Sequence, residues 1–231
     1  MREACSVIEL TVCHLYGNLL NTYGDNGNLL MLKHRAKQRG IQFNIEIISL
    51  NQSFDPSRYD LVFFGGGQDF EQRIVSKDLQ IKKEAISTYI ENDGVMVGIC
   101  GGFQLLGHYY VDAAGNKIAG AGAIDYYTLN QDHNRFIGDI IIKNEEFNET
   151  YTGFENHNGR TFLGDKVKPL GIIEKGQGNN GEDKTEGAHY KQTFCSYLHG
   201  PLLVQNVTLT DRIIKQAMKK RFPKQAEDLF A

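Results

Sequence analysis

A strand-turn-helix pattern around one cysteine is the feature that most constrains this chain of 231 residues. Val95 to Ile99 is a short, continuous apolar run, as expected for a buried strand, and residues 101–110 after it fit a helix. Cys100 lies between them, inside the G-x-C-x-G motif of residues 98–102. A sharp turn of this kind holds a nucleophile in a strained conformation, and the flanking glycines remove steric clashes. We therefore predict that the Cys100 thiol projects above a sheet edge, beside a helix N-terminus that favours its thiolate.

The alternative for Cys100 is a buried structural cysteine at a tight turn. The other cysteines, Cys5, Cys13 and Cys195, lie in strand-like runs without flanking glycines, which favours the core for them. Their wide spacing, with no CxxC, fits neither a disulfide framework nor a metal site. The chain also lacks a secretory-signal pattern and any apolar run of roughly 18 residues. These observations predict a reduced, cytoplasmic protein.

Strands and helices alternate through the first half of the chain. Strand-like runs cover residues 6–16, 41–50 and 60–64, and helical spacing covers residues 28–39 and 79–93. This order predicts an α/β fold with a mostly parallel sheet and crossover helices on both of its faces.

The second half has a different pattern. Two strand-like runs, AIDYYTL and RFIGDIIIK, precede residues 162–187, which are rich in Gly, Asn, Asp and Lys and predict β-hairpins with an exposed loop. A late strand over residues 193–198 and a helix over residues 211–221 follow. Because no linker or shift in composition marks a boundary, we predict one domain over residues 1–231.

A thiol nucleophile needs a base, and position selects His199 among the seven histidines. His199 follows the late apolar strand in the motif Tyr197-Leu198-His199-Gly200-Pro201. It can therefore reach the sheet edge that holds Cys100, and spatial adjacency is what a Cys/His pair requires.

The loop Gly65-Gly66-Gly67-Gln68-Asp69 ends another strand of the same predicted sheet. Its backbone N–H groups near Gly67 could face a developing oxyanion, with the N–H of Gly101 as a second donor. The alternative is an ordinary flexible connection between a strand and a helix.

Composition and missing motifs exclude several functions. The net charge is −3, whereas a chain that binds many phosphates is usually basic, so we expect no nucleic-acid partner. Neither a G-x-x-x-x-G-K-[ST] loop nor a G-x-G-x-x-G loop occurs. Acyl transfer by a thiol therefore fits this chain better than activation of a carboxylate with ATP.

Taken together, these residues resemble the class I (triad) glutamine amidotransferases, in the branch that contains cobyric acid synthase. The shared elements are GGGQD, GICGGFQLLG and YLHGP. Further segments resemble most closely the glutaminase subunits, of GatD type, of lipid II isoglutaminyl synthases: LNTYGDNGN, NRFIGDIII, GFENHNGRT and GNNGEDKTEGAHY. The resemblance implies the flavodoxin-like fold of the class I enzymes.

The resemblance also implies roles for individual residues. Cys100 attacks the side-chain amide of L-glutamine, His199 moves the proton, and N–H groups at Gly67 and Gly101 stabilise the oxyanion. Gln104 matches a position beside the glutamine pocket. Arg135 matches an arginine that pairs with the α-carboxylate of the substrate, a geometry that suits a guanidinium. From its pattern alone, Arg135 fits a surface strand residue better than a ligand of the substrate.

One position departs from the resemblance. Many class I amidotransferases have a glutamate two residues after the histidine, where this chain has Pro201. The chain could work with a Cys/His dyad, or an acid could come from elsewhere in the chain, with Glu155 as a candidate, or from a partner subunit.

The resemblance implies a Mur-ligase-like partner of MurT type, forming a heterodimer. The partner binds ATP and Mg²⁺ and uses the ammonia to amidate the D-glutamate α-carboxylate of lipid II, so no cofactor is expected here and membrane contact is indirect. Three alternatives stay open: an amidotransferase for another acceptor such as a corrinoid, a thiol hydrolase such as a peptidase, and a non-enzymatic regulatory subunit.

Overall fold

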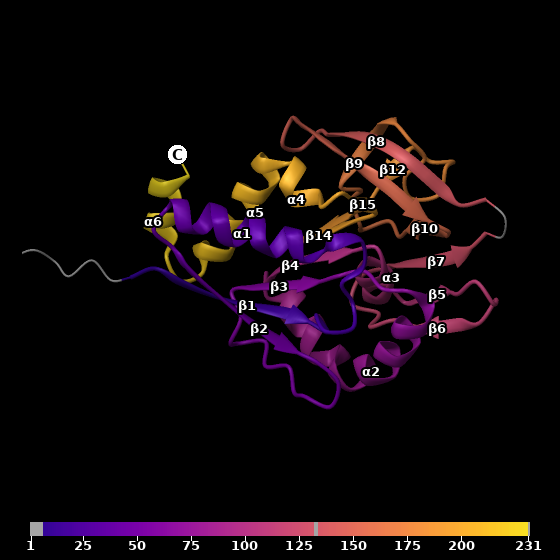
Figure 1. The fold of residues 1–231 in the computed structure, drawn as a ribbon, viewed down its shortest axis with the longest axis horizontal. Coiled ribbons are helices and arrows are strands. Elements are labelled where there is room, and N and C mark those ends of the chain that lie inside the picture. Colours follow the sequence, from indigo (N-terminus) through magenta and orange to yellow (C-terminus); the bar gives the residue numbers. More distant parts are fainter. Residues whose placement is uncertain (1–6, 132–133, 231) are drawn as a thin grey trace, which may run out of the picture.

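A six-stranded sheet organises the computed structural model, which describes residues 7–131 and 134–230 (Figure 1). Its order is β13-β14-β4-β3-β1-β2, with β13 antiparallel to β14 and all other pairs parallel. The strand bounds are β1 Glu9–Leu15, β2 Gln42–Ile48, β3 Leu61–Phe64, β4 Val95–Ile99, β13 Ala188–Tyr190 and β14 Thr193–Ser196. In chain order the parallel strands run 2-1-3-4-5, which is the flavodoxin-like arrangement and confirms the predicted fold class.

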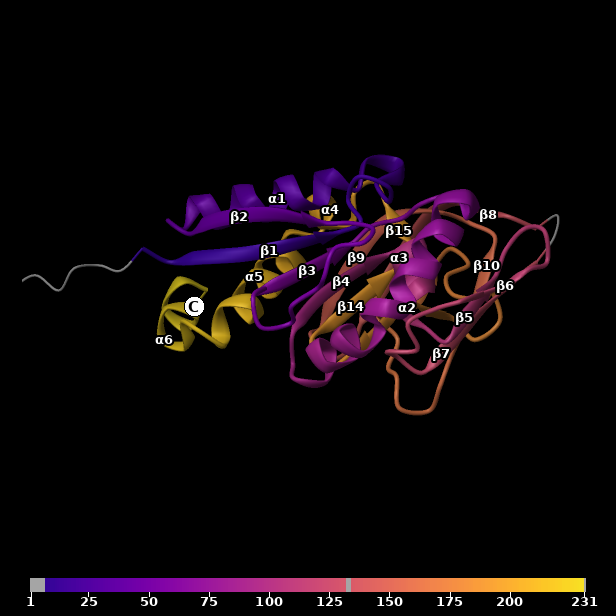
Figure 2. The same cartoon turned by 90° about the horizontal axis from the view of Figure 1, so that it is seen from below.

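Helices cover both faces of this sheet because successive residues of each strand point to opposite sides (Figure 2). Val12 packs in one core cluster with residues of α1 (Asn26–Gln38) and α5 (Val207–Lys219). Cys13, its neighbour, packs in the other cluster with residues of α2 (Asp69–Glu91) and α3 (Gly101–Leu106). A 3₁₀ turn, η1 (Thr22–Gly24), and two short helices, α4 (Leu202–Gln205) and α6 (Pro223–Leu229), complete the helical elements that the described residues form.

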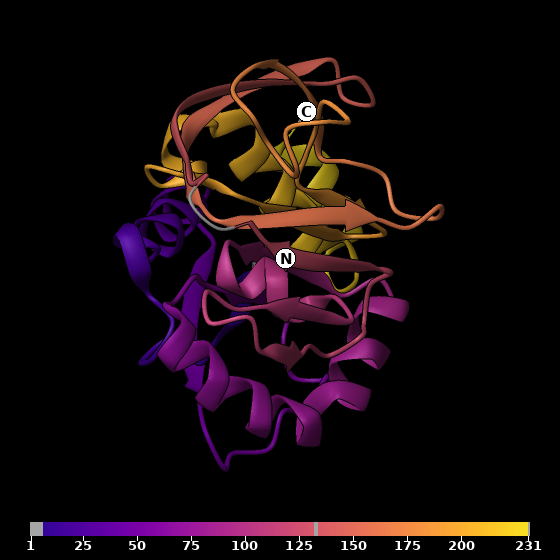
Figure 3. The ribbon, with the colours of Figure 1, turned by 90° about the vertical axis from the view of Figure 1, so that its right-hand side faces the viewer.

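Two smaller sheets come from the second half of the chain. One has the order β10-β7-β5-β6, with bounds β5 Tyr109–Val111, β6 Lys117–Ala119, β7 Tyr126–Asn130 and β10 Gly159–Leu163. The other has the order β12-β11-β8-β9-β15, with bounds β8 Phe136–Asn144, β9 Glu149–His157, β11 Gly171–Lys175, β12 Thr185–Glu186 and β15 Leu198–His199. Figures 1 and 3 show these strands gathered at the end of the molecule away from α6.

Several boundaries differ from those expected. Helix α2 begins at Asp69 rather than at residue 79, because its first turns bury polar side chains such as Gln72 and Asp78 that no apolar periodicity reveals. Helix α3 ends at Leu106, and residues 109–111 form a strand instead. In the segment expected to form hairpins with an exposed loop, residues 174–177 and 181–184 are exposed, whereas residues 178–180 between them are buried.

Candidate active site

Cys100 occupies the turn between β4 and α3. Its φ of 50° and ψ of −103° lie outside the regions that side-chain-bearing residues normally adopt. Its N–H donates to the carbonyl oxygen of Ser196 over 2.9 Å, which attaches the turn to the end of β14. The strained strand-to-helix turn expected from the sequence is therefore present, and a strained backbone of this kind is typical of functional sites.

Glycines allow the loop after β3 to lie directly against this turn. A Cβ on Gly66 would lie 3.1 Å from the Cβ of Cys100, and one on Gly102 would lie 2.1 Å from the carbonyl oxygen of Phe64. A Cβ on Gly101 would lie 3.0 Å from the backbone nitrogen of Gly67. The two proposed oxyanion donors, Gly67 and Gly101, are thus neighbours beside the nucleophile.

A pocket of about 370 Å³ opens at Cys100. Its lining includes four of the residues selected from the sequence: Gly67, Cys100, Gln104 and Arg135. Elements from both halves of the chain contribute to it, from η1 to the β9–β10 turn. The position agrees with the general rule that ligands bind outside the carboxyl ends of the strands in a doubly wound sheet.

Gln104 is buried on the inner face of this pocket. Its Nε2 donates to the hydroxyl of Tyr197 over 3.2 Å, and its Oε1 accepts a hydrogen bond of 3.3 Å from Nε2 of Gln72. The Tyr197 hydroxyl in turn lies 2.7 Å from Oγ1 of Thr161. Both ends of the Gln104 amide are therefore held, so its side chain forms a fixed wall of the pocket.

Arg135 immediately precedes β8 and borders the pocket from the second-half sheets. Its Nε donates to Oδ1 of Asn156 over 2.5 Å, and its Nη2 donates to the carbonyl oxygen of the same residue over 3.1 Å. The guanidinium is thus oriented by the neighbouring strand β9. This placement puts a cation in the same pocket as the thiol.

His199 reaches the Cys100 region through strand pairing, as expected. Strand β14 pairs with β4 so that Ser196 lies opposite Ile99, one residue before the nucleophile. The imidazole is only 3 % exposed. Strand pairing therefore places His199 near the sheet edge that holds Cys100, although His199 is not among the residues that line the pocket.

Asp25 is the site residue that the sequence analysis did not select. Its carboxylate is 1 % exposed, and Oδ2 accepts a hydrogen bond of 2.5 Å from the N–H of Gly66. Its Oδ1 lies 4.0 Å from Nδ1 of His199. Asp25 follows β1 and Gly66 follows β3, and these strands flank the switch point of a 2-1-3-4-5 sheet. The motif LNTYGDNGN contained this aspartate, but only the strand order indicates what it contacts.

Glu155, the candidate acid for His199 in the sequence analysis, is hydrogen-bonded elsewhere. Its two carboxylate oxygens accept hydrogen bonds of 2.9 Å each from the N–H groups of Gln177 and Gly178. On the paired strands β9 and β15, it is Phe154 that lies opposite His199. Glu155 therefore anchors the loop after β11, and Asp25 is the acid at His199.

Burial sets the protonation state of the proposed pair. Burial, together with the negative charge of Asp25, raises the pKa of the Cys100 thiol to about 12, although the Gly101 N–H and the Arg135 charge act in the opposite direction. Burial and, secondarily, the Arg135 charge lower the pKa of His199 to about 4. The helix N-terminus was expected to favour the thiolate, but in this state desolvation outweighs it. Thiol and imidazole are both neutral near pH 7.

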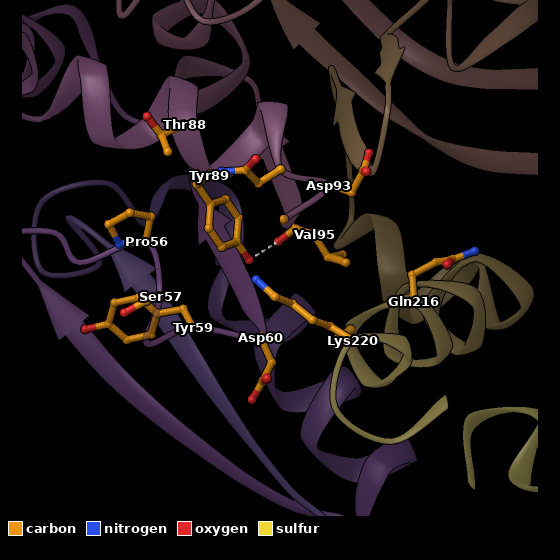
Figure 4. Close-up of a pocket in the computed structure, with 13 residues that line it drawn as sticks. Pro56, Ser57, Tyr59, Asp60, Thr88, Tyr89, Asp93, Val95, Gln216 and Lys220 are labelled. Carbon is orange, nitrogen blue, oxygen red and sulfur yellow. Dashed lines mark hydrogen bonds between the residues drawn. The ribbon is translucent and has the colours of Figure 1, made fainter. Parts of the chain in front are cut away.

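A second cavity, of about 160 Å³, lies at the opposite end of the parallel strands (Figure 4). It is lined by Asp60, before β3, by Val95, at the start of β4, and by Lys220. The Tyr89 hydroxyl donates to the Val95 carbonyl across it. None of the residues selected from the sequence lines this cavity, so the pocket at Cys100 is the candidate active site.

A flavodoxin-like sheet, a cysteine on a strained turn, a buried histidine and adjacent backbone donors define a thiol-dependent acyl-transfer protein. Comparison with known proteins specifies the family. Residues 11–207 match the model of the CobB/CobQ-like glutamine amidotransferase domain, and the chain belongs to this family.

Two curated relatives share most of the chain. The GatD subunit of the glutamine-hydrolysing lipid II isoglutaminyl synthase of Streptococcus pneumoniae is 58 % identical over 93 % of this chain and 82 % of its own. The corresponding subunit of Staphylococcus aureus is 40 % identical over 92 % of this chain and 86 % of its own. Cobyric acid synthase of Listeria innocua is 31 % identical, over 69 % of this chain but only 32 % of its own. The resemblance inferred from the sequence is therefore confirmed.

A solved structure supports the fold independently. A chain described as a glutamine amidotransferase superposes with a TM-score of 0.58 over 89 % of this chain and 98 % of its own, at 15 % identity. At that identity the likeness concerns the fold alone. Among residues 7–131 and 134–230, no helix combines the length and the apolar character needed to cross a membrane.

Proposed function

We propose that this chain is the glutaminase subunit of a lipid II isoglutaminyl synthase and hydrolyses L-glutamine to glutamate and ammonia at Cys100. The observation that supports it best is the pocket that combines the Cys100 thiol, the Arg135 guanidinium and the adjacent backbone of Gly67 and Gly101. The high identity to two GatD subunits supports the same assignment.

The reaction begins with attack of the Cys100 sulfur on the side-chain carbonyl carbon of glutamine. The thiol is protonated at rest, so His199 takes its proton as the carbon–sulfur bond forms. The carbonyl oxygen becomes an oxyanion, to which the N–H groups of Gly67 and Gly101 donate. His199 then returns the proton to the departing nitrogen, and ammonia leaves a glutamyl thioester.

Water completes the cycle. His199 takes a proton from the water as its oxygen attacks the thioester carbonyl, and the same backbone N–H groups stabilise the second oxyanion. Collapse of this intermediate breaks the carbon–sulfur bond, releases glutamate and returns the proton to the sulfur. The net reaction consumes one water and needs no oxidant, reductant or metal ion.

Arg135 couples substrate binding to the base. The α-carboxylate of glutamine pairs with the guanidinium and offsets its positive charge. Because that charge lowers the pKa of His199, its neutralisation raises this pKa and makes the imidazole a stronger base when substrate is present. The free site thus holds a weaker base than the loaded one.

Asp25 acts as the positioning residue for His199. A carboxylate near Nδ1 favours the tautomer whose other nitrogen accepts the thiol proton, and it stabilises the imidazolium that forms. The distance of 4.0 Å is longer than a hydrogen bond, so a small adjustment of the imidazole completes the contact.

The ammonia serves a second subunit in this proposal. That subunit is Mur-ligase-like, of MurT type, binds ATP and Mg²⁺, and amidates the D-glutamate α-carboxylate of lipid II in the cytoplasm. The pair forms a heterodimer, and contact with the membrane runs through lipid II. The chain itself then needs no bound cofactor, since hydrolysis at a thioester requires none.

Reconstitution tests this function. The chain and the ligase subunit are incubated with glutamine, ATP, Mg²⁺ and lipid II, and both glutamate release and lipid II amidation are measured. We expect both products with Cys100 intact and neither with Cys100→Ser. A corrinoid acid serves as the competing acceptor, and amidation of the corrinoid but not of lipid II would favour the cobyric-acid-type alternative.

A further inference from the structure

The loop between β3 and α2 is held by three hydrogen bonds to backbone groups of two successive residues, Gly66 and Gly67. The N–H of Gly66 donates to Asp25 over 2.5 Å, and the carbonyl of Gly66 accepts a bond of 3.0 Å from the N–H of Thr22. The carbonyl of Gly67 accepts a bond of 2.9 Å from Nε2 of Gln72. The β1–α1 connection therefore holds one end of this loop, and helix α2 holds the other.

These bonds determine where the Gly67 N–H points. In a planar trans peptide the N–H and the C=O point in opposite directions. The Gly66 carbonyl faces Thr22, so the Gly67 N–H faces away from Thr22, on the side where the Gly67 nitrogen lies beside Gly101. The Gly67 carbonyl bond to Gln72 fixes the next peptide in the same way. Glycine permits many backbone conformations, so without these bonds both peptides could rotate at little cost.

Gln72 contacts both halves of the oxyanion site. Besides its bond to Gly67, its Nε2 lies 2.5 Å from where a Cβ on Gly101 would be, which places the amide against the residue after the nucleophile. The same nitrogen donates to Gln104 over 3.3 Å, and Gln104 donates to Tyr197. Gln72 is 3 % exposed, so little water is available to replace these bonds.

We propose that Gln72 is a positioning residue that preorganises the oxyanion site. It holds the Gly67 carbonyl and lies against Gly101, which restrains the backbone directly after the Gly67 donor, while Asp25 and Thr22 hold the Gly66–Gly67 peptide that carries the donor N–H. Gln72 lines the pocket, and its hydrogen bonds go to the Gly67 carbonyl and to Gln104 rather than to Cys100. Its effect lies in the stabilisation of the oxyanion, because donors that are already oriented need no reorganisation when charge develops. The inference rests on the proposed glutaminase function and adds a residue to it.

The test compares two reactions of the same thiol in Gln72→Met. Glutamine hydrolysis passes through an oxyanion, whereas alkylation of Cys100 by iodoacetamide forms the carbon–sulfur bond as iodide leaves and creates no oxyanion. For the chain with its ligase subunit, we expect kcat for glutamine to fall roughly ten- to a thousandfold, since loss of one oxyanion donor costs about 10²–10³. KM and the alkylation rate should each stay within about threefold.

Gln80→Met is the matched control. Gln80 lies on the same helix, and its Nε2 donates to the backbone carbonyl of Gly120 over 3.0 Å, remote from Cys100. Its kinetics should match those of the wild type. An unchanged kcat in Gln72→Met overturns the inference, as does an equal loss in the alkylation rate, which would mean general disorder of the site. A rise in KM alone would assign Gln72 to ground-state binding instead. A wild type that does not hydrolyse glutamine contradicts the proposed function itself.

Discussion

Oδ1 of Asp25 lies 4.0 Å from Nδ1 of His199, and Oδ2 of the same carboxylate binds the N–H of Gly66. One buried acid therefore lies near the proposed base and is hydrogen-bonded to the loop that would present the oxyanion donors. The chain has Pro201 two residues after His199, where an acid would otherwise be expected, and Asp25 is the acid that we propose for this role.

We expect Asp25→Asn to lower kcat for glutamine roughly 10²- to 10⁴-fold. An amide can donate to the imidazole and thereby select the wrong tautomer, which in the serine-protease triad costs about 10⁴. Glutamate release under saturating glutamine measures the loss. The matched control is Glu155→Gln, which alters the bonds to the loop after β11 and should lower the melting temperature more than kcat. A larger loss of kcat in the control than in Asp25→Asn would assign the acid to Glu155.

Asp25 should also make stability depend on pH in a defined direction. Burial raises its pKa to about 7. At pH values between about 3.9, the ordinary pKa of an aspartate, and about 7, Asp25 is protonated in the folded state and ionised in the unfolded state. Stability contributed by the protonated acid is therefore fully present at low pH and is lost as the pH rises toward 7, by up to about 1.4 kcal/mol per pH unit.

The comparison of wild type with Asp25→Asn isolates this contribution. Asparagine does not titrate, so we expect the variant to gain in free energy of unfolding relative to the wild type as the pH rises from about 4 to 7. Urea unfolding of both proteins at several pH values measures the difference, and groups common to both cancel. A constant difference over this range would show that Asp25 titrates as it does in the unfolded chain. A gain in stability with a loss of activity is the pattern of a residue retained for function.

The sequence predicted the parts of the site that have a local pattern. The apolar run before Cys100 and the glycines around it require a strand, a tight turn and close packing, and the structure has all three. His199 was found because it follows an apolar strand, and strands of a parallel sheet end at one edge. For Arg135 and Gln104, physical patterns alone were ambiguous, and only family resemblance placed them in the pocket.

Asp25 and Gln72 could not be found in this way. Asp25 lies in an irregular connection and acts on residues far away in the chain, so no spacing rule marks it. Gln72 lies in the first turns of α2, where polar side chains are buried by hydrogen bonding rather than by apolar periodicity. For the same reason, the sequence analysis placed the start of helix α2 at residue 79, ten residues after its actual start at Asp69. Buried polar networks depend on partners from several strands, and a single sequence does not show which strands are neighbours in the sheet.

Cys100→Ser should abolish glutamine hydrolysis and leave the fold intact. An alcohol is far less nucleophilic than a thiol near neutral pH, and the change in volume is small. Cys195→Ser is the control, because Cys195 is fully buried in the core with its Sγ 4.0 Å from the Tyr126 hydroxyl. It should lower the melting temperature and keep the kinetics. Near-wild-type hydrolysis by Cys100→Ser with a normal melting curve would rule out Cys100 as the nucleophile.

Arg135→Ala should mainly weaken glutamine binding. Loss of a charge-assisted hydrogen-bonded pair costs about 1.5–3 kcal/mol, or roughly ten- to a hundredfold in affinity. The change should appear in KM, with Arg135→Lys intermediate because an ammonium keeps the charge but not the two parallel bonds. Initial rates over a wide range of glutamine concentration measure it. Unchanged kinetics in Arg135→Ala would mean that the guanidinium does not bind glutamine and only makes its hydrogen bonds to Asn156.

The isolated chain should be a poor glutaminase that the proposed ligase subunit activates. The gap between Asp25 and His199 exceeds hydrogen-bond length, so the imidazole samples unproductive orientations until the contact closes. Two apolar side chains are exposed on neighbouring helices: Leu30 on α1 is 66 % exposed and Val204 on α4 is 44 % exposed. Helix α1 packs against α4, and α4 begins directly after Pro201, close to the strand that carries His199. Docking of the ligase subunit on these helices could therefore shift His199. Glutamate release is measured for the chain alone and with a stoichiometric ligase subunit, with and without ATP. We expect stimulation of at least tenfold, and we expect Asp25→Asn to lose most of it, since the partner would then have no acid to bring into contact. Full activity in the isolated chain, unchanged by the partner, would show that Asp25 already orients His199 without help.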